Sequence, residues 1–310
     1  MLNAELKNDE FISDCDGLRI STLTAIPNGE IRGILQLVHG MCEYKERYTH
    51  FMDYMAGRGF ITVIHDNRGH GKSILNDDDL GFFYEGGGEG YVEDIAQLNR
   101  ITKSKFNNLP YFLLGHSMGS LGVRTFIKKY DSLINGLFVC GSPCFDKFSN
   151  IGMAIESAIS HKLGEHYRSD KIAGIMEANF NRNFGDIPHS WICGDAEIID
   201  KYNADPLCNF TFTLNGYEAL LYLINETYSE KGWNITNPDI PIRFISGMDD
   251  PCMVSEKRFY NAIELLKDVG YINVSGDLFS DMRHEVLNEK NNIIVYNYIA
   301  ENLLSWIDKD

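Results

Sequence analysis

Short, nearly continuous apolar runs recur along the chain, and each ends at a glycine or a polar residue. Runs of this kind are typical of parallel strands that are buried on both faces of a sheet. Residues 18–25 differ, because apolar and polar side chains alternate there as in a half-exposed antiparallel strand. The continuous runs occupy residues 33–40, 60–66, 111–115, 136–142 and 242–247, and a last strand is expected at residues 274–280.

Segments with a helical period separate these runs. They lie at residues 45–58, 90–106, 118–130 and 255–269. The alternation of strands and helices predicts the α/β class, with a mostly parallel central sheet that carries helices on both faces. In sheets of this kind, ligands and reactive groups gather at the carboxyl ends of the strands.

The alternation stops between residues 143 and 214. Apolar residues there form two helical stripes, as in amphipathic helices. The stripes comprise Ile151, Ile155, Ile159 and Leu163, then Ile172, Ile175, Met176, Phe180 and Phe184. Such helices either face the core or form a lid over the strand ends, and their place directly after a strand favours the lid. We therefore expect an α/β core at residues 1–142 and 215–310, with an inserted helical lid at residues 143–214.

Charge and cysteine content narrow the expected partners and location. The 310 residues include 44 acidic and 28 basic side chains, which gives a formal net charge of −16. This charge repels phosphate backbones, so nucleic-acid binding is not expected. No apolar run approaches the roughly 18 residues that a membrane-spanning helix needs. The acidic N-terminal segment does not resemble a signal peptide, and the cysteines are odd in number and scattered, so a cytoplasmic protein with reduced thiols is expected.

The segment Gly115-His116-Ser117-Met118-Gly119 has the spacing G-x-S-x-G between a predicted strand and a predicted helix. In that context the spacing indicates a nucleophile elbow, a sharp turn that exposes a serine at the top of the sheet. The serine also lies at the start of a helix, where free N–H groups favour developing negative charge. Ser117 is therefore the candidate nucleophile.

A nucleophilic serine needs a base that a carboxylate orients. Asp249 and Asp250 lie just past the end of a predicted strand, and His284 follows the last predicted strand. The chain order serine, acid, histidine is that of α/β-hydrolases. This order selects His284 as the base and leaves two candidates for the acid, of which we favour Asp250.

An oxyanion hole needs two backbone N–H groups. Met118, directly after the serine, and Met41, in the loop after an earlier strand, are the candidates. Around them, His39, Gly40 and His116 are expected to act as scaffold. Glu43 either steadies the oxyanion loop or forms a surface ion pair with Arg47, four residues further on.

Two other signals favour ordinary structure over chemistry. The glycine cluster at residues 84–91 lacks the G-x-G-x-x-G spacing of a dinucleotide loop, so a flexible loop is expected there. Cys42, Cys140, Cys144 and Cys252 lie near the expected site, but no zinc spacing is present. Neither a metal nor a cofactor is expected.

Several motifs together resemble the monoglyceride-lipase and lysophospholipase-like branch of the α/β-hydrolases, grouped with the serine aminopeptidase-like hydrolases. The resemblance extends from about residue 18 to residue 306 and includes the lid segment 191–213. Its HGxxEHxxRY motif is matched by His39, Gly40, Glu43, Arg47 and Tyr48, with Cys42 and Tyr44 as departures. Its DxRGHGxS motif is matched by Asp66, Arg68, Gly69, His70, Gly71 and Ser73. The GHSMGS motif is complete, and the GxxDP and RHExLNE motifs contain Asp250 and His284.

The resemblance implies a serine hydrolase that cleaves a monoacylglycerol, a lysophospholipid or a short-to-medium acyl ester. It also implies Asp250 as the catalytic acid. An alternative is a serine aminopeptidase, which would need a lid carboxylate to hold the α-ammonium group of its substrate. Candidates for that carboxylate are Glu156, Glu165, Glu177 and Glu197. A non-catalytic, ligand-binding homologue is the third possibility, and the oligomeric state is left open.

Overall fold

The computed structural model describes residues 3–144 and 163–308. Within them, eight strands form one sheet in the order β1-β2-β4-β3-β5-β6-β7-β8. The strands are β1 (Ala4–Ile12), β2 (Arg19–Pro27), β3 (Gly33–Val38), β4 (Phe60–His65), β5 (Tyr111–His116), β6 (Gly136–Cys140), β7 (Ile242–Gly247) and β8 (Val274–Phe279). Strands β3 to β8 run parallel, whereas β1 pairs with β2 and β2 with β4 in antiparallel fashion. The predicted mostly parallel sheet is confirmed.

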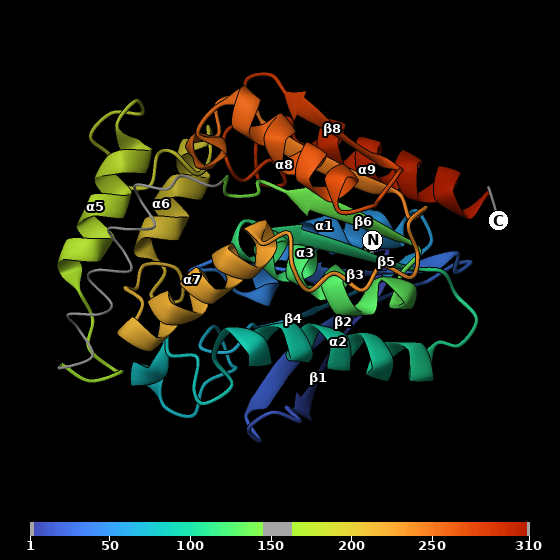
Figure 1. Cartoon of the computed structure of the whole chain (residues 1–310), viewed down its shortest axis with the longest axis horizontal. Coiled ribbons are helices and arrows are strands. Elements are labelled where there is room, and N and C mark those ends of the chain that lie inside the picture. The colour runs from blue at the N-terminus through green and yellow to red at the C-terminus, as the bar shows by residue number, and fades with distance from the viewer. Residues whose placement is uncertain (1–2, 145–162, 309–310) are drawn as a thin grey trace.

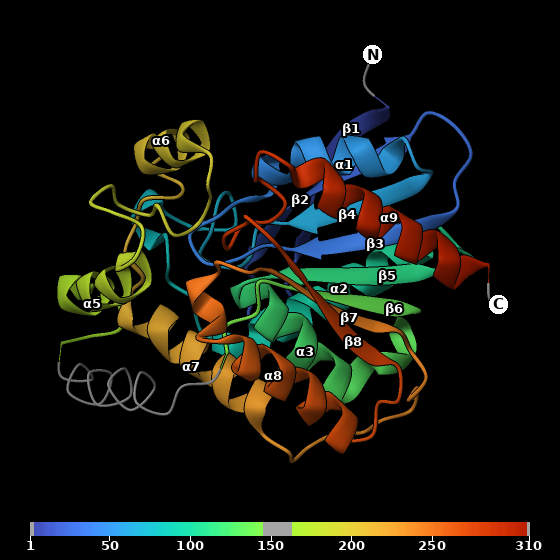
Figure 2. The same cartoon turned by 90° about the horizontal axis from the view of Figure 1, so that it is seen from above.

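Helices cover both faces of this sheet, as Figures 1 and 2 show. The described helices are α1 (Thr49–Ala56), α2 (Gly87–Lys105), α3 (Met118–Tyr130), α5 (Asp170–Asn181), α6 (Ala196–Ala204), α7 (Leu214–Tyr228), α8 (Glu256–Asp268) and α9 (Asn292–Ile307). Helices α1 and α9 lie on one face, and α2, α3 and α8 lie on the other. Among the described helices, none is long and apolar enough to cross a membrane.

The continuous apolar runs reflect this double coverage. Neighbouring residues of one strand enter different cores: Ile34 belongs to the cluster under α2 and α3, while Leu35 belongs to the cluster under α1 and α9. Leu113 and Leu114 in β5 divide in the same way. Because both faces are buried, neither face needs polar side chains, and no alternation appears in the sequence.

The glycine cluster at residues 84–91 is not a flexible loop, and that prediction was wrong. It contains the start of α2, which begins at Gly87. A methyl group at Gly90 would lie 2.7 Å from the guanidinium carbon of Arg68, and one at Gly86 would overlap the same group. Gly86 and Gly90 therefore make room for a buried arginine side chain.

Four 3₁₀ turns complete the described elements: η1 (Lys45–Tyr48), η2 (Asp77–Asp79), η3 (Asp131–Leu133) and η4 (Pro251–Met253). The helix predicted at residues 45–58 is thus η1 followed by the shorter α1. Strand β1 was not predicted, because it is an edge strand whose side chains are almost all exposed. Helices α7 and α9 were also missed.

Candidate active site

Ser117 occupies a sharp turn between β5 and α3. Its backbone has φ 53° and ψ −119°, a region that non-glycine residues rarely adopt. The N–H of Ser117 donates to the carbonyl oxygen of Cys140 over 3.0 Å, which ties the turn to the end of β6. A side chain at Gly119 would overlap the carbonyl oxygen of Val38. Close packing of α3 against β3 thus requires glycine here and holds the serine at the helix N-terminus.

Asp250 and His284 form a buried pair at the ends of β7 and β8. Oδ1 of Asp250 lies 3.0 Å from Nδ1 of His284, and each residue is 3% exposed. The carboxylate also accepts hydrogen bonds from the hydroxyl of Ser246 at 2.7 Å and the N–H of Cys252 at 2.9 Å. Burial alone would raise the pKa of Asp250, but His284 and these donors hold it below its usual value. Asp249 is exposed, so the structure brings only Asp250 to the histidine.

His284 lies close to the serine turn. Its ring centroid is 4.8 Å from that of His116, the residue before Ser117. Nε2 of His116 lies 3.3 Å from the carbonyl oxygen of His284. Trp191 contacts the imidazole as well, with ring centroids 5.0 Å apart. With Nδ1 occupied by Asp250, the Nε2 atom is the one free to exchange a proton.

The loop after β3 approaches the same serine. A methyl group at Gly40 would lie 2.9 Å from Cβ of Ser117. Met41 follows Gly40 directly and is half-buried, while Met118 follows Ser117 and is buried. The two predicted oxyanion donors are therefore on the two backbone segments that meet at the serine.

Glu43 fixes this loop from the interior of the protein. Its Oε1 accepts the N–H of Gly40 at 3.0 Å and lies 2.8 Å from Nδ1 of His116, and its Oε2 accepts a hydrogen bond from Arg47 at 3.0 Å. Since Glu43 is only 2% exposed, a surface ion pair with Arg47 is the wrong description. Burial would raise the pKa of Glu43, but His116 and Arg47 hold it well below its usual value. Burial would lower the pKa of His116, yet Glu43 raises it overall.

Arg47 extends this set to the histidine loop. Its two terminal nitrogens each donate to one oxygen of Glu285 over 2.8 Å, and Glu285 follows His284. We name Glu43, Arg47, His116 and Glu285 the elbow cluster. The Arg47–Glu285 contact was not predicted, because the two residues are 238 positions apart and no spacing reveals it.

His39 is part of the scaffold. Its Nε2 accepts the N–H of Asn67 at 2.9 Å, and its Nδ1 lies 2.8 Å from the carbonyl oxygen of Gly40. Burial lowers the pKa of His39 well below its usual value, so the ring is neutral. A neutral, fully bonded ring joins the loops after β3 and β4.

The described part of the expected lid, residues 163–214, lies beyond the carboxyl ends of the strands, where Figures 1 and 2 show α5 and α6. It contacts the loops of the site directly. The Tyr44 hydroxyl donates to Asp205 over 2.7 Å, and the N–H of Glu285 donates to the carbonyl oxygen of Ile192 over 2.6 Å. These hydrogen bonds join residues 163–214 to the loops that follow β3 and β8.

The two predicted stripes have different outcomes. The residues of the first lie outside the described residues, apart from Leu163, which is exposed. In the second, Ile172 is buried, and Met176, Phe180 and Phe184 are half-buried. Ile175 is 61% exposed and does not belong to the buried side of α5.

One group of three possible metal ligands occurs among the described residues. Donor atoms of Asp250, Cys252 and His284 lie within 4.8 Å of one another, and all three residues are buried. A metal ion here would compete for the same atoms that join Asp250 to His284. Burial raises the pKa of the Cys252 thiol well above its usual value, so it is not a ready thiolate ligand. All seven cysteines are free.

The chain resembles known hydrolases in sequence and in structure. The family model described as "Serine aminopeptidase, S33" matches residues 29–291. A monoacylglycerol lipase of Mycolicibacterium smegmatis is 24% identical over 303 residues, which are 97% of either chain. A carboxyl esterase from Bacillus coagulans, crystallised with glycerol, has a TM-score of 0.88 at 24% identity and covers 97% of this chain and 99% of its own. A soluble variant of monoglyceride lipase from Saccharomyces cerevisiae has a TM-score of 0.73 at 19% identity, covering 100% and 96%.

Proposed function

The chain belongs to the serine aminopeptidase S33 family, in the monoglyceride-lipase-like branch of the α/β-hydrolases, and we propose that it hydrolyses a carboxylic ester through an acyl-enzyme. In this proposal Ser117 is the nucleophile, His284 is the general base, and Asp250 orients the imidazole. The N–H groups of Met41 and Met118 bind the oxyanion.

The reaction proceeds in two acyl transfers. The oxygen of Ser117 attacks the ester carbonyl carbon while its proton passes to Nε2 of His284. The imidazolium gives this proton to the departing alcohol, and the acyl group stays on the serine oxygen. Water then attacks the acyl carbon, loses a proton to His284, and the proton returns to Ser117 as the carboxylic acid leaves.

The observation that carries the proposal is the buried Asp250–His284 pair beside the strained serine turn. A carboxylate at 3.0 Å from Nδ1 fixes the tautomer in which Nε2 can accept a proton. It also stabilises the imidazolium, because the pair is buried and weakly screened. An elbow without such a base would hold only an unactivated hydroxyl.

The proposed substrate is a monoacylglycerol, a lysophospholipid or a short-to-medium acyl ester. Apolar side chains beside the reacting groups support this class: Trp191 contacts the His284 ring, and Met41 is half-buried at the predicted oxyanion loop. The names of the relatives favour the same class.

The described residues of the expected lid give less support to peptide substrates. Of the glutamates that could hold an α-ammonium group, Glu177 already accepts the indole N–H of Trp191 at 3.0 Å and the N–H of His189 at 2.7 Å. Glu165 and Glu197 are exposed, and Glu156 lies outside the described residues. The ester reading is therefore preferred.

A panel of p-nitrophenyl esters of graded chain length tests the proposal, beside labelling with a fluorophosphonate probe. We expect turnover and labelling of the wild type, and neither for Ser117→Ala. Wild-type turnover no faster than that of Ser117→Ala would contradict the proposal. Aminoacyl-coumarin substrates in the same assay separate a peptidase from an esterase. A ligand that raises the melting temperature without turnover would indicate a binding protein.

A further inference from the structure

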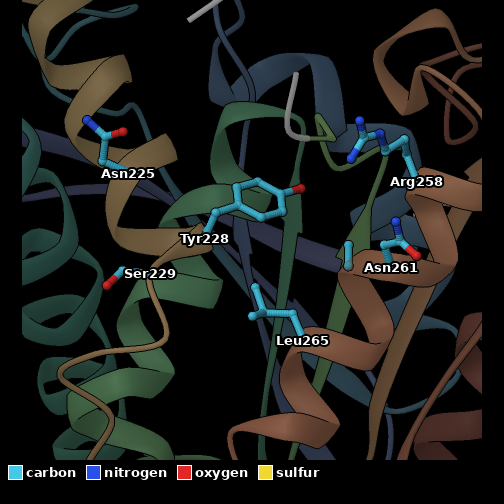
Figure 3. Close-up of a pocket in the computed structure, with 7 residues that line it drawn as sticks. Asn225, Tyr228, Ser229, Arg258, Asn261 and Leu265 are labelled. Carbon is cyan, nitrogen blue, oxygen red and sulfur yellow. The ribbon is translucent and has the colours of Figure 1, made fainter. Parts of the chain in front are cut away.

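A cavity lies between α7 and α8, apart from the residues of the proposed reaction (Figure 3). Its volume is about 370 Å³, within the range of small-molecule sites. The residues that line it are Asn225, Tyr228, Ser229, Arg258, Asn261, Ala262 and Leu265. They recur at three- and four-residue intervals on both helices, so they form two facing stripes.

The lining combines one positive charge with polar and apolar groups. Arg258 is exposed and supplies the charge. The amides of Asn225 and Asn261 and the hydroxyl of Ser229 can donate hydrogen bonds, and none of the described lining residues carries a carboxylate. Ala262, Leu265 and the Tyr228 ring add apolar surface. In Figure 3 the Tyr228 side chain extends from α7 toward α8.

Directly behind Tyr228 lies a second arginine. Arg124 of α3 is fully buried, and its Cζ is 4.6 Å from the centroid of the Tyr228 ring and 5.4 Å from that of Phe244. Its Nη1 donates to the Tyr228 hydroxyl at 3.2 Å and to the Ser142 hydroxyl at 3.1 Å. Nε and Nη2 have no hydrogen-bond partner among the described residues.

This arginine differs from the other buried cations. Lys45, Arg47 and Arg68 each contact a carboxylate at 2.6 to 2.8 Å. Arg124, in contrast, forms no ion pair with any residue that the structure describes. A buried charge without a counter-ion is costly, and its field is weakly screened in a low-dielectric interior. An anion in the adjacent cavity, one aromatic ring away, would offset that cost.

We propose that the α7–α8 cavity binds a fatty carboxylate, that is, a carboxylate with a medium-length alkyl chain. The carboxylate would contact Arg258 and the side-chain amides of Asn225 and Asn261. It would also be attracted by the positive charge of Arg124 behind the Tyr228 ring. The chain would lie against Leu265, Ala262 and the Tyr228 ring. The proposal does not depend on the reaction at Ser117, because none of the lining residues takes part in it.

Isothermal titration calorimetry with three probes tests this proposal. Octanoate has both the charge and the chain, acetate has only the charge, and octanamide has only the chain. We expect saturable 1:1 binding of octanoate that is at least about tenfold tighter than that of either other probe. Equal affinity for octanoate and acetate would show a simple anion site, and equal affinity for octanoate and octanamide would show that charge is irrelevant. Either result overturns the proposal.

Variants locate the bound octanoate. Arg258→Gln should weaken binding by about tenfold or more, because it removes the contacting charge. Lys257→Gln is the matched control: it removes the same charge from the neighbouring exposed position, which does not line the cavity, and should leave affinity unchanged. Asn261→Trp keeps both arginines but fills the cavity, and should abolish binding.

Arg124→Met should also weaken binding, and thermal melting shows whether that variant folds. If it does not fold, Arg258→Gln and Asn261→Trp still decide the question. Octanoate binding of equal strength in wild type, Arg258→Gln and Asn261→Trp would place the ligand elsewhere, for example at the acyl site of Ser117, and overturn the proposal. Since calorimetry needs no turnover, a failed ester assay leaves this result intact.

Discussion

Two clusters of buried charge in this protein have nearly the same composition. In the elbow cluster Arg47 lies between Glu43 and Glu285. In a second set, which we name the scaffold cluster, Arg68 lies between Asp16 and Asp94, with Ser13 as a further partner. The carboxylate side chains of both are at most 5% exposed. Burial and pairing alone therefore do not distinguish them.

What differs is the backbone that each cluster holds. The scaffold cluster joins the turn between β1 and β2, the loop after β4 and the first turns of α2. The elbow cluster joins the N–H of Gly40, the residue before Ser117 and the residue after His284. Similar buried ion pairs can thus support either the fold or a site, and their location decides which role to test.

The largest expected effect lies next to the elbow cluster, at Asp250. Asp250→Asn should lower kcat/KM for an acyl ester by about 10³–10⁴-fold, because the amide favours the wrong imidazole tautomer. Asp249→Asn changes the same atoms on an exposed neighbour and should leave kcat/KM unchanged. Equal losses in the two variants would contradict the assignment of Asp250.

A smaller effect on rate is expected within the elbow cluster. Glu43→Gln should lower kcat by about 100-fold, because Gly40 and His116 lose the charge that positions them, and small misplacements are costly. The matched change in the scaffold cluster is Asp94→Asn. It should leave kcat of the folded enzyme unchanged and change only the free energy of unfolding, by roughly 1–3 kcal/mol.

Steady-state kinetics measure kcat of Glu43→Gln and Asp94→Asn, and urea unfolding measures the free energy of unfolding of both variants. If Asp94→Asn lowered kcat as much as Glu43→Gln, the two clusters would not differ in role. A Glu43→Gln variant that lost stability but kept its kcat would assign Glu43 to the fold alone.

The same contrast shows which features the sequence could predict. The sheet, most of its helices and the position of Ser117 followed from apolar runs and a motif, which are local signals. The elbow cluster did not follow, since Arg47 and Glu285 meet only after the sheet brings the ends of β3 and β8 to one edge. The glycines at the start of α2 were wrongly predicted to form a loop for the same reason: Gly86 and Gly90 leave room for Arg68, which lies outside that segment of the sequence.

One carboxylate of each cluster, Asp94 and Glu43, should contribute to the pH dependence of stability with opposite sign. Burial raises the pKa of Asp94 from 3.8 to about 6, against the opposing effect of Arg68. Its stabilising contribution is present below about pH 3.8 and is lost as pH rises through about 6, by about 2–3 kcal/mol in all. The pKa of Glu43 lies below its usual 4.5, so its contribution is present above that pH and is lost on acidification.

Urea unfolding from pH 3 to pH 7 measures this difference. The free energy of unfolding of the wild type, minus that of Asp94→Asn, should fall as pH rises from 4 to 7. The free energy of unfolding of the wild type, minus that of Glu43→Gln, should fall as pH falls from 5 to 3. Parallel curves for wild type and either variant would contradict the corresponding pKa direction.

The smallest expected effect comes from replacing each arginine by lysine. Arg47 contacts both oxygens of Glu285, and a lysine keeps the charge but cannot make that two-point contact. Arg47→Lys should therefore lower kcat by roughly three- to tenfold, since the loop of His284 is held less firmly. Arg68→Lys cannot keep all of the separate contacts to Asp16, Asp94 and Ser13 in the scaffold cluster and should lower only the melting temperature. Parallel kinetics and thermal melting measure both effects, and an Arg68→Lys enzyme with the lower kcat of the two would reverse the roles assigned to the clusters.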